Sequence, residues 1–351
     1  MRSRRYHSVT FKRQVVLEVL GGEASRAALA RRYGLSPSLI RNWEKAYHAD
    51  RLDDTARQAS MDLEAGIREL ERMVGQLATN SRSLFPKTIQ LETTTICPAH
   101  CIMCPHKQMS PRPNLMDMRI IEKVIDECAG KDVTIIPHQM GDPLADNRMM
   151  DILKKCKDAG LKILMSTSGI LLDSVKAKQM VDMGVDVINI SFDSLDKRTY
   201  EKIRGLSFDE VMKNVMGLMA IKRPPTSVWV SAVDIFFTER TREHFLDYWS
   251  KVADHVQITP FARYPKVNDR RLPKGKRNDS RECQRLENDL IILSNGEVAK
   301  CCIDFEGMDS FGNVGYEPIS EIWNGEKRKA FLDRINLAGR RKLRPCNICV
   351  L

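Results

Sequence analysis

The feature that most constrains this 351-residue chain is a short loop with three cysteines. The run Cys97-Pro98-Ala99-His100-Cys101-Ile102-Met103-Cys104 follows directly on an apolar, β-rich segment. Three thiolates this close together can hold one metal centre, and sulfur ligands select zinc or iron–sulfur clusters. A cubane cluster held by three cysteines keeps one iron without a protein ligand, so a chelating cofactor or substrate can bind there. The fold must therefore present this loop at an accessible end of a strand.

Strand-like and helix-like segments alternate from residue 87 to residue 260. Six β-rich runs separated by helical patterns predict a parallel sheet with right-handed crossovers. Such a sheet curves into a partial or complete barrel and binds ligands at the carboxyl ends of its strands. We therefore expect an α/β fold, a partial (β/α)6 barrel resembling a TIM barrel. The predicted strands are 89–94, 133–139, 161–166, 185–191, 228–235 and 256–259, and the predicted helices are 119–128, 148–159, 174–183, 208–221 and 243–252.

The C-x3-C-x2-C spacing after the first strand resembles that of the radical S-adenosylmethionine (SAM) superfamily. The resemblance implies a [4Fe-4S] cluster held by Cys97, Cys101 and Cys104, with the amino and carboxylate groups of SAM on the fourth iron. It further implies one-electron cleavage of SAM to a 5′-deoxyadenosyl radical that abstracts a hydrogen atom from the substrate. An external one-electron reductant is then a required partner. Zinc is the alternative for these three thiols.

Residues at the ends of the following strands resemble the SAM contacts of this superfamily. Met140-Gly141-Asp142-Pro143 stands where the family has Gly-Gly-Glu-Pro, so the backbone is the safer part of the likeness. Met103 takes a position that lies against the adenine, and Arg204 one that meets the SAM carboxylate. Any one of these polar residues taken alone is better explained as a turn or cap residue, and it is their occurrence on four successive strand ends that favours a shared site. The resemblance implies a SAM site of Met103, Gly141, Asp142, Pro143, Ser166, Ser168, Ser191, Asp193 and Arg204.

A second group of cysteines lies near the end of the chain. Its expected ligands are Cys283, Cys301, Cys346 and Cys349. Asn295-Gly296 joins the β-rich runs 290–293 and 297–301 as a hairpin turn, and a helix is expected over 319–334. The pattern resembles the SPASM and twitch extensions of radical SAM enzymes, which implies a second, auxiliary [4Fe-4S] cluster in a small α+β domain. Cys302 is the spare thiol and can exchange roles with Cys301, and a four-cysteine zinc site is the alternative.

The N-terminal segment has the pattern of an all-α helix-turn-helix domain. Apolar residues recur at helical spacing in three segments, with Gly21-Gly22 after the first and Gly34 before the third. The run from Ala28 to Pro37 resembles the helix-turn-helix of insertion-element transposases, which implies DNA binding but not transposition. The expected DNA contacts on the third helix are Ser38, Arg41, Asn42 and Lys45. The alternative is a three-helix bundle used for docking or dimerisation.

The net charge of +10 is concentrated in two segments. Residues 1–49 carry +7 and residues 263–281 carry +6, which leaves −3 for the rest of the chain. The second segment is expected to form a lid over the barrel mouth that favours an anionic substrate, or else a solvated loop. No stretch approaches 18 consecutive apolar residues, and the Arg-rich start lacks the apolar core of a signal peptide. We therefore expect a cytoplasmic protein without a membrane partner.

These patterns divide the chain into four regions. Heptad spacing over 63–77 predicts a short coiled coil that can form a dimer. The regions are a helix-turn-helix domain at 1–56, the coiled coil and linker at 57–86, a radical SAM barrel at 87–262, and the basic loop with the auxiliary iron–sulfur domain at 263–351.

The expected function is that of a radical SAM oxidoreductase acting on a small, carbohydrate-like molecule. A cluster with four protein ligands has no place for a substrate, so its expected role is to accept an electron. The nearest analogues by architecture are the twitch dehydrogenases that oxidise a secondary alcohol of an aminocyclitol. The alternatives are a peptide or protein maturase and a DNA-binding regulator whose barrel senses SAM or redox state. No catalytic residue is assigned, and the candidates for the proton acceptor are His138, Asp234, Arg263 and Tyr264.

Overall fold

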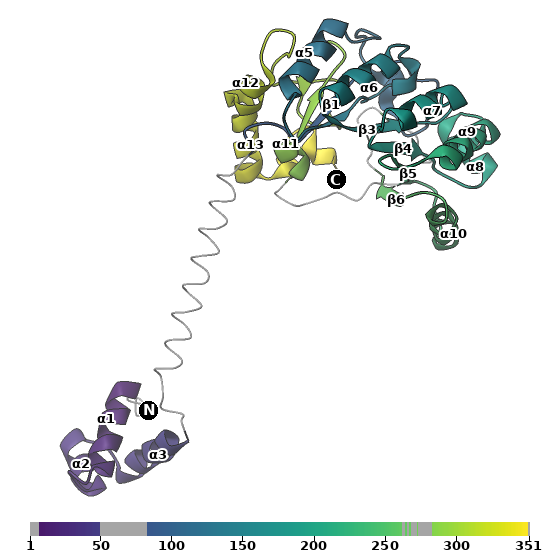
Figure 1. Cartoon of the computed structure of the whole chain (residues 1–351). Coiled ribbons are helices and arrows are strands. Elements are labelled where there is room, and N and C mark those ends of the chain that lie inside the picture. Colours follow the sequence, from purple (N-terminus) through teal and green to yellow (C-terminus); the bar gives the residue numbers. More distant parts are fainter. Residues whose placement is uncertain are drawn as a thin grey trace. The chain divides into compact units, whose positions relative to one another are not determined.

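The computed structural model describes residues 7–49, 83–261, 264, 267, 272 and 283–349. The chain divides into two compact units, Met1–Arg82 and Ser83–Leu351, and each is described by itself (Figure 1). The coiled coil expected at 63–77, and most of the basic loop expected at 263–281, lie outside the described residues. Within the described residues, no helix is long and apolar enough to cross a membrane.

Three helices form the first unit, namely α1 (Val9–Leu20), α2 (Arg26–Tyr33) and α3 (Pro37–His48). Each begins after a serine whose hydroxyl accepts a hydrogen bond from a backbone N–H three residues further on. α2 ends at Gly34, whose φ of 65° lies in the left-handed region where glycine is unstrained. The expected order of helix, turn and helix is therefore confirmed. The helices share a small core of Val15, Val16, Leu29, Ala30, Ile40 and Trp43.

An eight-stranded sheet forms the framework of the second unit. Its order is β6-β5-β4-β3-β2-β1-β7-β8, and every neighbouring pair is parallel except β7 and β8. In the described part of the chain β6 and β8 are the edges, so the expected partial barrel is confirmed. The strands are β1 (Thr88–Leu91), β2 (Thr134–Ile136), β3 (Lys162–Thr167), β4 (Val187–Ser191), β5 (Ser227–Asp234), β6 (His255–Pro260), β7 (Asp289–Ile292) and β8 (Val298–Ala299).

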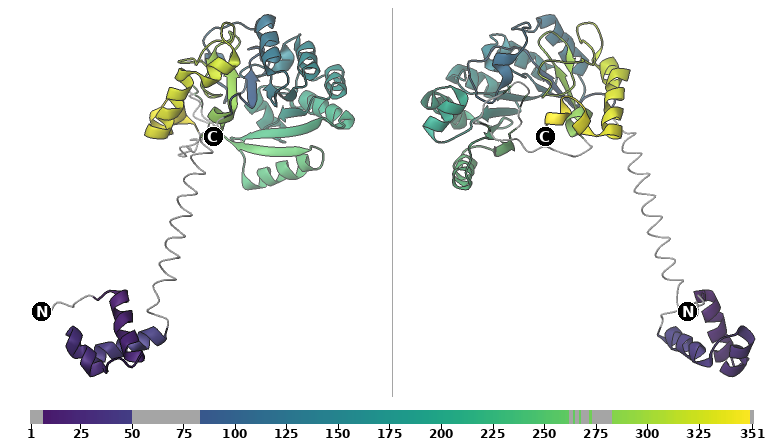
Figure 2. Two further views of the ribbon diagram at one scale, coloured as in Figure 1. Left: turned by 60° about the vertical axis from the view of Figure 1, so that its left-hand side comes forward. Right: turned by 180° about the vertical axis from the view of Figure 1, so that it is seen from behind.

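Helices connect the barrel strands and lie along the outer side of the sheet (Figure 2). The sequence analysis did not predict α8, because its eight residues are mostly charged and only Tyr200 and Ile203 bury apolar side chains. Its capping residues, Asp196 at the start and Gly205 at the end, are the signals that could have revealed it. These helices are α5 (Met118–Cys128), α6 (Met149–Asp158), α7 (Ser174–Asp182), α8 (Lys197–Arg204), α9 (Phe208–Ile221) and α10 (Glu239–Ser250), with the short 3-10 helices η1 (Pro105–Gln108) and η2 (Pro143–Ala145).

The two faces of the sheet differ in chemistry. On β5, Val228, Val230 and Ala232 are buried in the main hydrophobic core that includes residues of the helices. Because side chains alternate along a strand, Trp229 and Ser231 lie on the other, concave face. On β5 that face is only partly buried. It is therefore the face on which a ligand can be held.

The C-terminal region continues the barrel rather than forming a separate layer. β7 pairs with β1 in parallel, from Thr88 opposite Asp289 to Leu91 opposite Ile292, and the β7–β8 hairpin turns at Gly296 with φ 83°. The single helix expected at 319–334 is wrong, because the chain breaks at Gly325, which has extended dihedral angles. The helices here are α11 (Gln284–Asn288), α12 (Ile319–Asn324) and α13 (Glu326–Ala338), followed by η3 (Arg340–Lys342) and η4 (Cys346–Ile348).

Candidate cluster and SAM site

The three-cysteine loop leaves the carboxyl end of β1 and is held by the end of α8. The backbone N–H of His100 donates to the carbonyl of Arg204 at 2.9 Å, and that of Ile102 donates to Ile203 at 3.0 Å. Gly205 ends α8 with φ 65°, and a Cβ atom there would lie 3.0 Å from the Cβ of His100. The position of the loop is therefore fixed by α8, a helix that the sequence analysis missed.

The thiols of this loop lie close enough to affect one another's ionisation. Burial raises the pKa of Cys97 to about 12, and the neighbouring thiols of Cys101 and Cys104 add to the shift. Burial likewise raises the pKa of Cys101, and that of Cys104 to about 11. Three soft sulfur donors in one loop fit an iron–sulfur cluster, whose positive irons would favour the thiolates that burial disfavours. Within the described residues, however, no three ligand side chains already converge as they do around a bound ion.

The Gly-Asp-Pro turn after β2 is locked against the segment that leads into the cysteine loop. A Cβ atom on Gly141 would lie 2.2 Å from the carbonyl oxygen of Thr94, so only glycine fits there. The N–H of Asp142 donates to the carbonyl of Ile96 at 2.9 Å, one residue before Cys97. This turn therefore helps to fix the position of the first cysteine.

The carboxylate of Asp142 is occupied by groups of the protein itself. It accepts from the Thr167 hydroxyl at 2.9 Å, from the Ser168 N–H at 2.9 Å, and from the Ser168 hydroxyl at 2.5 Å. Asp142 and Ser168 are both buried. These bonds tie the end of β2 to the end of β3, which gives both side chains a structural role. Their contact with SAM, and that of Pro143, stays a prediction.

Asp193 and Arg204 form a buried ion pair beside the cysteine loop. Arg204 Nε donates to Asp193 Oδ2 at 2.5 Å, and Asp193 Oδ1 accepts from the N–H of Val233 at 2.8 Å. Arg204 Nη1 lies 3.8 Å from the sulfur of Cys101. Burial alone would lower the pKa of Arg204, but Asp193 and Cys101 beside it hold that pKa above its usual value. A permanent positive charge therefore lies next to one of the three cysteines.

A row of polar side chains crosses the concave face on three adjacent strands. Asn189 on β4 donates from Nδ2 to the hydroxyl of Ser166 on β3 at 2.8 Å and to that of Ser231 on β5 at 3.0 Å. Its Oδ1 is buried and has no hydrogen-bond partner among the described residues. Ser166 was expected at the SAM site, whereas Asn189 and Ser231 were not predicted. Polar residues alternating with apolar ones in β4 and β5 are the signal that could have found them.

His138, one of the candidate proton acceptors, follows β2 and also has a buried ring nitrogen without a partner. Burial lowers its pKa to about 4, although the nearby carboxylate of Asp142 acts in the opposite direction. The imidazole is therefore neutral at physiological pH, so it can accept a proton or a hydrogen bond. Asp234, another candidate, instead pairs with Arg242 at 2.6 Å.

A buried carboxylate that the sequence analysis missed joins the barrel to the C-terminal hairpin. Glu92, just after β1, is fully buried and accepts two hydrogen bonds from Arg112 at 2.6 and 2.7 Å. The carboxylate also accepts from the N–H groups of Met140 at 3.3 Å and Ser294 at 3.0 Å. Arg112 Nη1 donates to the carbonyl of Phe305 at 2.6 Å. No motif in the sequence predicts this arrangement, because Glu92 and Arg112 bond to Ser294 and Phe305, which are about two hundred residues away in the chain.

The C-terminal cysteines come together from three segments. Burial raises the pKa of Cys346 to about 11, and the thiols of Cys283 and Cys349 contribute to the rise. Burial also raises the pKa values of Cys301 and Cys302, with Cys302 acting on Cys301 and Cys349 acting on Cys302. The four expected ligands therefore lie in one neighbourhood, which fits a cluster held by protein thiolates. Cys302 lies in the same neighbourhood, so both members of the Cys301-Cys302 pair remain candidates.

Tyr264 lies between the two groups of cysteines. It belongs to the same apolar cluster as Met103 and Cys101 of the first loop, and its ring meets that of Phe305 edge-on at 5.9 Å. Burial raises the pKa of Tyr264, as do the thiols of Cys302 and Cys104. Met103, expected to face the adenine of SAM, is thus in the same apolar cluster. Tyr264 is therefore close enough to thiols of both groups for each group to affect its ionisation.

In the first unit, the expected DNA contacts Ser38, Arg41, Asn42 and Lys45 are all exposed on α3. The opposite side of α3 holds the core residues Ile40 and Trp43. An exposed polar and basic helix face can enter a DNA groove, but nothing in the unit itself identifies a bound sequence.

Together, the open α/β barrel, the cysteine loop after β1 and the clustered C-terminal thiols define an iron–sulfur protein. Family models agree and narrow the class. Residues 91–248 match the radical SAM superfamily, residues 283–350 match the iron–sulfur cluster-binding domain called SPASM, and residues 1–75 match a transposase family of the helix-turn-helix type. Residues 91–248 therefore form a radical SAM domain and residues 283–350 a SPASM domain, and these domains imply a [4Fe-4S] cluster, SAM and auxiliary iron–sulfur ligation.

Curated relatives resemble part of the chain. A probable GTP 3′,8-cyclase of Methanococcus maripaludis is 28% identical over 179 residues, which are 50% of this chain and 59% of the relative. A PqqA peptide cyclase of Methylobacterium nodulans is 29% identical over 129 residues, 36% of this chain and 34% of the relative. The chain thus spans less than two thirds of the length of these relatives.

Solved structures share the fold. SuiB of Streptococcus suis, bound to its precursor peptide SuiA, has a TM-score of 0.59 at 15% identity, covering 80% of this chain and 73% of that chain. BtrN in complex with AdoMet and 2-DOIA has a TM-score of 0.50 at 16% identity, covering 75% of this chain and 92% of that chain. At these identities the likeness shows the fold alone.

Proposed function

We propose that this chain is a radical SAM oxidoreductase that oxidises a small, hydroxyl-rich substrate on the concave face of its barrel. The observation that carries the proposal is the position of Tyr264, which belongs to the apolar cluster around Met103 and Cys101 and is also close to the thiols of Cys301 and Cys302. A substrate held there lies beside both sites. When bound, the cofactors supply a carbon-centred radical for hydrogen abstraction and an acceptor for one electron. A dehydrogenation needs both.

The residues of the chain have separate tasks in this proposal. Arg204 holds a positive charge beside Cys101 and favours its thiolate. The Glu92–Arg112 pair keeps the C-terminal thiols in register with the first loop, because its bonds reach Ser294 and Phe305. His138 is the candidate proton acceptor, since its buried ring nitrogen is neutral and unpartnered among the described residues.

The substrate class follows from the polar row on the concave face. Asn189 offers an unpartnered Oδ1, and Ser166 and Ser231 offer hydroxyls on either side. These groups are uncharged and can both donate and accept hydrogen bonds, as the hydroxyls of a carbohydrate or cyclitol require. The segment 263–281, proposed as a lid favouring an anionic substrate, lies mostly outside the described residues.

Anaerobic incubation tests the proposal. The reconstituted chain is mixed with SAM, dithionite and the small-molecule fraction of a cell extract, and 5′-deoxyadenosine is measured against a Cys97→Ala control. The expected result is an excess of 5′-deoxyadenosine together with a substrate that has lost two hydrogens. Equal amounts with the variant and the native chain, in every fraction, would contradict an enzymatic role.

A peptide or protein maturase is the second candidate, favoured by the likeness to a peptide cyclase and to a peptide-bound structure. The same incubation distinguishes it when the extract is divided by size. Stimulation by the peptide fraction, with a crosslink or a mass loss of two hydrogens in a peptide, would replace the small-molecule proposal.

The first unit is proposed to bind DNA through α3, either as an appended module or as part of a regulator. The variant Arg41→Ala/Asn42→Ala/Lys45→Ala is expected to lose retention on DNA. Lys12→Ala/Arg13→Ala on α1 serves as the comparison. Equal retention by both variants and the native chain would contradict readout by α3.

A further inference from the structure

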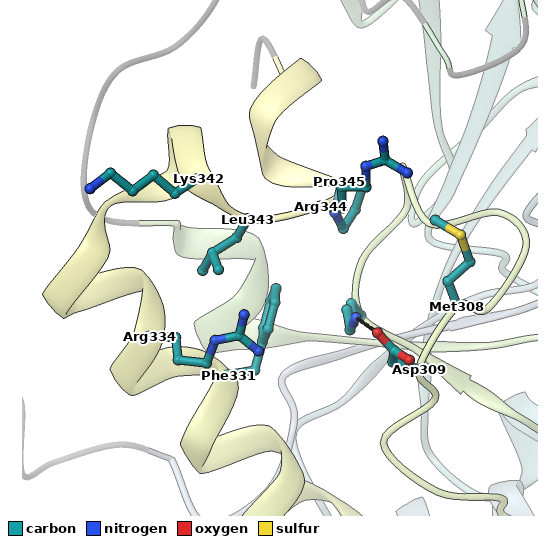
Figure 3. Close-up of a pocket in the computed structure, with 9 residues that line it drawn as sticks. Met308, Asp309, Phe331, Arg334, Lys342, Leu343, Arg344 and Pro345 are labelled. Carbon is teal, nitrogen blue, oxygen red and sulfur yellow. Dashed lines mark hydrogen bonds and ion pairs between the residues drawn. The ribbon is translucent and has the colours of Figure 1, made fainter.

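A cavity of about 540 Å³ opens in the C-terminal region, and none of its lining residues is assigned to the barrel site (Figure 3). Its walls come from the loop after β8, from α13 and from the segment that links η3 to η4. No function described above uses it. Its lining residues are Lys300, Met308, Asp309, Phe331, Arg334, Lys342, Leu343, Arg344 and Pro345.

The cavity carries four cations and one carboxylate. Lys300 pairs with Asp309 at 3.0 Å and lies 5.2 Å from the centre of the Phe331 ring. Asp309 is therefore already neutralised, and its φ of 55° holds it in a conformation unusual for a residue other than glycine. The other three cations, Arg334, Lys342 and Arg344, are exposed. Lys300, and to a smaller extent Arg334, lower the pKa of Asp309, so the positive charges outnumber the single carboxylate. The three exposed side chains, called the basic rim below, form a cluster of positive charge that favours an anionic partner.

This basic rim lies directly outside the C-terminal thiols. Lys300 immediately precedes Cys301, and Pro345 immediately precedes Cys346. Arg340, just before this segment, donates from Nη2 to the sulfur of Cys349 at 3.2 Å. Two of the expected cluster ligands, Cys301 and Cys346, are therefore direct chain neighbours of residues that line the cavity.

We propose that this cavity is the docking site of an acidic electron-carrier protein of the flavodoxin or ferredoxin type. The inference deepens the proposed function, because an oxidoreductase with an electron-accepting site needs a carrier that reaches that site. Complementary charge steers such encounters and fixes their orientation, while the apolar floor of Met308, Leu343 and Pro345 supplies contact area. A free phosphate-bearing ligand would use the same cations, so the test includes one.

The test measures binding of an acidic flavodoxin to the full, reconstituted chain at about 50 mM and about 300 mM salt. In the variant Arg334→Glu/Lys342→Glu/Arg344→Glu, the dissociation constant at low salt is expected to rise at least about tenfold. The matched control Arg198→Glu/Lys213→Glu/Arg240→Glu makes the same charge change at exposed residues of the barrel helices and is expected to change it less than about twofold. The single variant Lys342→Glu, at one exposed residue, is expected to give about threefold.

Activity driven by dithionite separates this inference from the proposed function. Both triple variants are expected to keep their dithionite-driven formation of 5′-deoxyadenosine, because a small reductant needs no docking site. If the native chain forms no oxidised product with dithionite, the proposed function is contradicted, whereas the flavodoxin-binding result is unaffected. Equal flavodoxin affinity in the native chain and the rim variant, equal losses in both triple variants, or binding of pyrophosphate but not flavodoxin would each overturn the docking proposal.

Discussion

The two thiol sites are built in opposite ways. The first takes Cys97, Cys101 and Cys104 from one loop, whose backbone is seated on the end of α8. The second gathers thiols from three segments between Cys283 and Cys349, so it exists only when the hairpin and the chain end have folded together. Each site nevertheless has an arginine beside a thiol, Arg204 near Cys101 and Arg340 near Cys349. The ligands of the first site are thus close together in the sequence, whereas those of the second are brought together by the tertiary fold.

The largest expected difference between the sites is in SAM cleavage. Cys101→Ser is expected to lower the rate of 5′-deoxyadenosine formation more than about 100-fold, because it removes one of only three ligands from the site that binds SAM. Cys346→Ser is expected to preserve that cleavage within about threefold while oxidised product disappears. The rates of both products are measured with dithionite under anaerobic conditions. Equal loss of SAM cleavage in both variants would contradict the claim that only the first site cleaves SAM.

The connection between the sites is expected to depend on the buried Glu92–Arg112 pair. Glu92→Ala leaves the guanidinium of Arg112 buried without its carboxylate, and the free energy of unfolding is expected to fall by about 3–5 kcal/mol. Glu122→Ala breaks the exposed pair with Lys155 and is expected to cost less than about 1 kcal/mol. Denaturant titration of both variants measures this. A loss at Glu92 no greater than at Glu122 would show that the pair does not hold the two regions together.

The smallest of these effects is the pH dependence contributed by His138 beside the first site. Its folded pKa of about 4 lies below the unfolded value of about 6.5, so the unfolded chain binds more protons between these two pH values. The contribution is complete above about pH 6.5 and is lost as the pH falls towards 4, to a total of about 3 kcal/mol. His138→Gln is expected to flatten this part of the stability curve, and His244→Gln, at an exposed residue, to leave it unchanged. An identical slope in all three chains would contradict the burial of the imidazole.

The parts of the fold that the sequence predicts are those with a local pattern, and the parts that it misses form by tertiary assembly. The strands and most helices of the barrel are recognisable because their apolar periodicity is local, although the first two strands are shorter than expected where their polar ends become site loops. The short helix α8 is mostly charged and shows little apolar periodicity, and Gly325 interrupts a segment expected to be one helix. The pairing of β7 with β1 joins segments that are far apart in the chain.

The residues of the candidate site also fall into two groups, those found from the sequence and those that only the structure reveals. The cysteines are found from spacing, because a cluster needs several thiols within a short reach. Glu92 and Asn189 were missed because their partners lie on other strands and loops. Asp142, Ser168, Asp193 and Arg204 were recognised as polar residues at strand ends, but their bonds to protein groups appear only when those ends meet.

Iron content tests the central claim, that two cysteine groups of different construction each hold an iron–sulfur cluster. After anaerobic reconstitution, the native chain is expected to bind about eight irons, and Cys104→Ser and Cys346→Ser about four each. Cys128→Ser, at a buried cysteine of α5 remote from both groups in sequence, serves as the control and is expected to keep about eight. About four irons with one equivalent of zinc in the native chain, or unchanged iron in Cys346→Ser, would contradict the account.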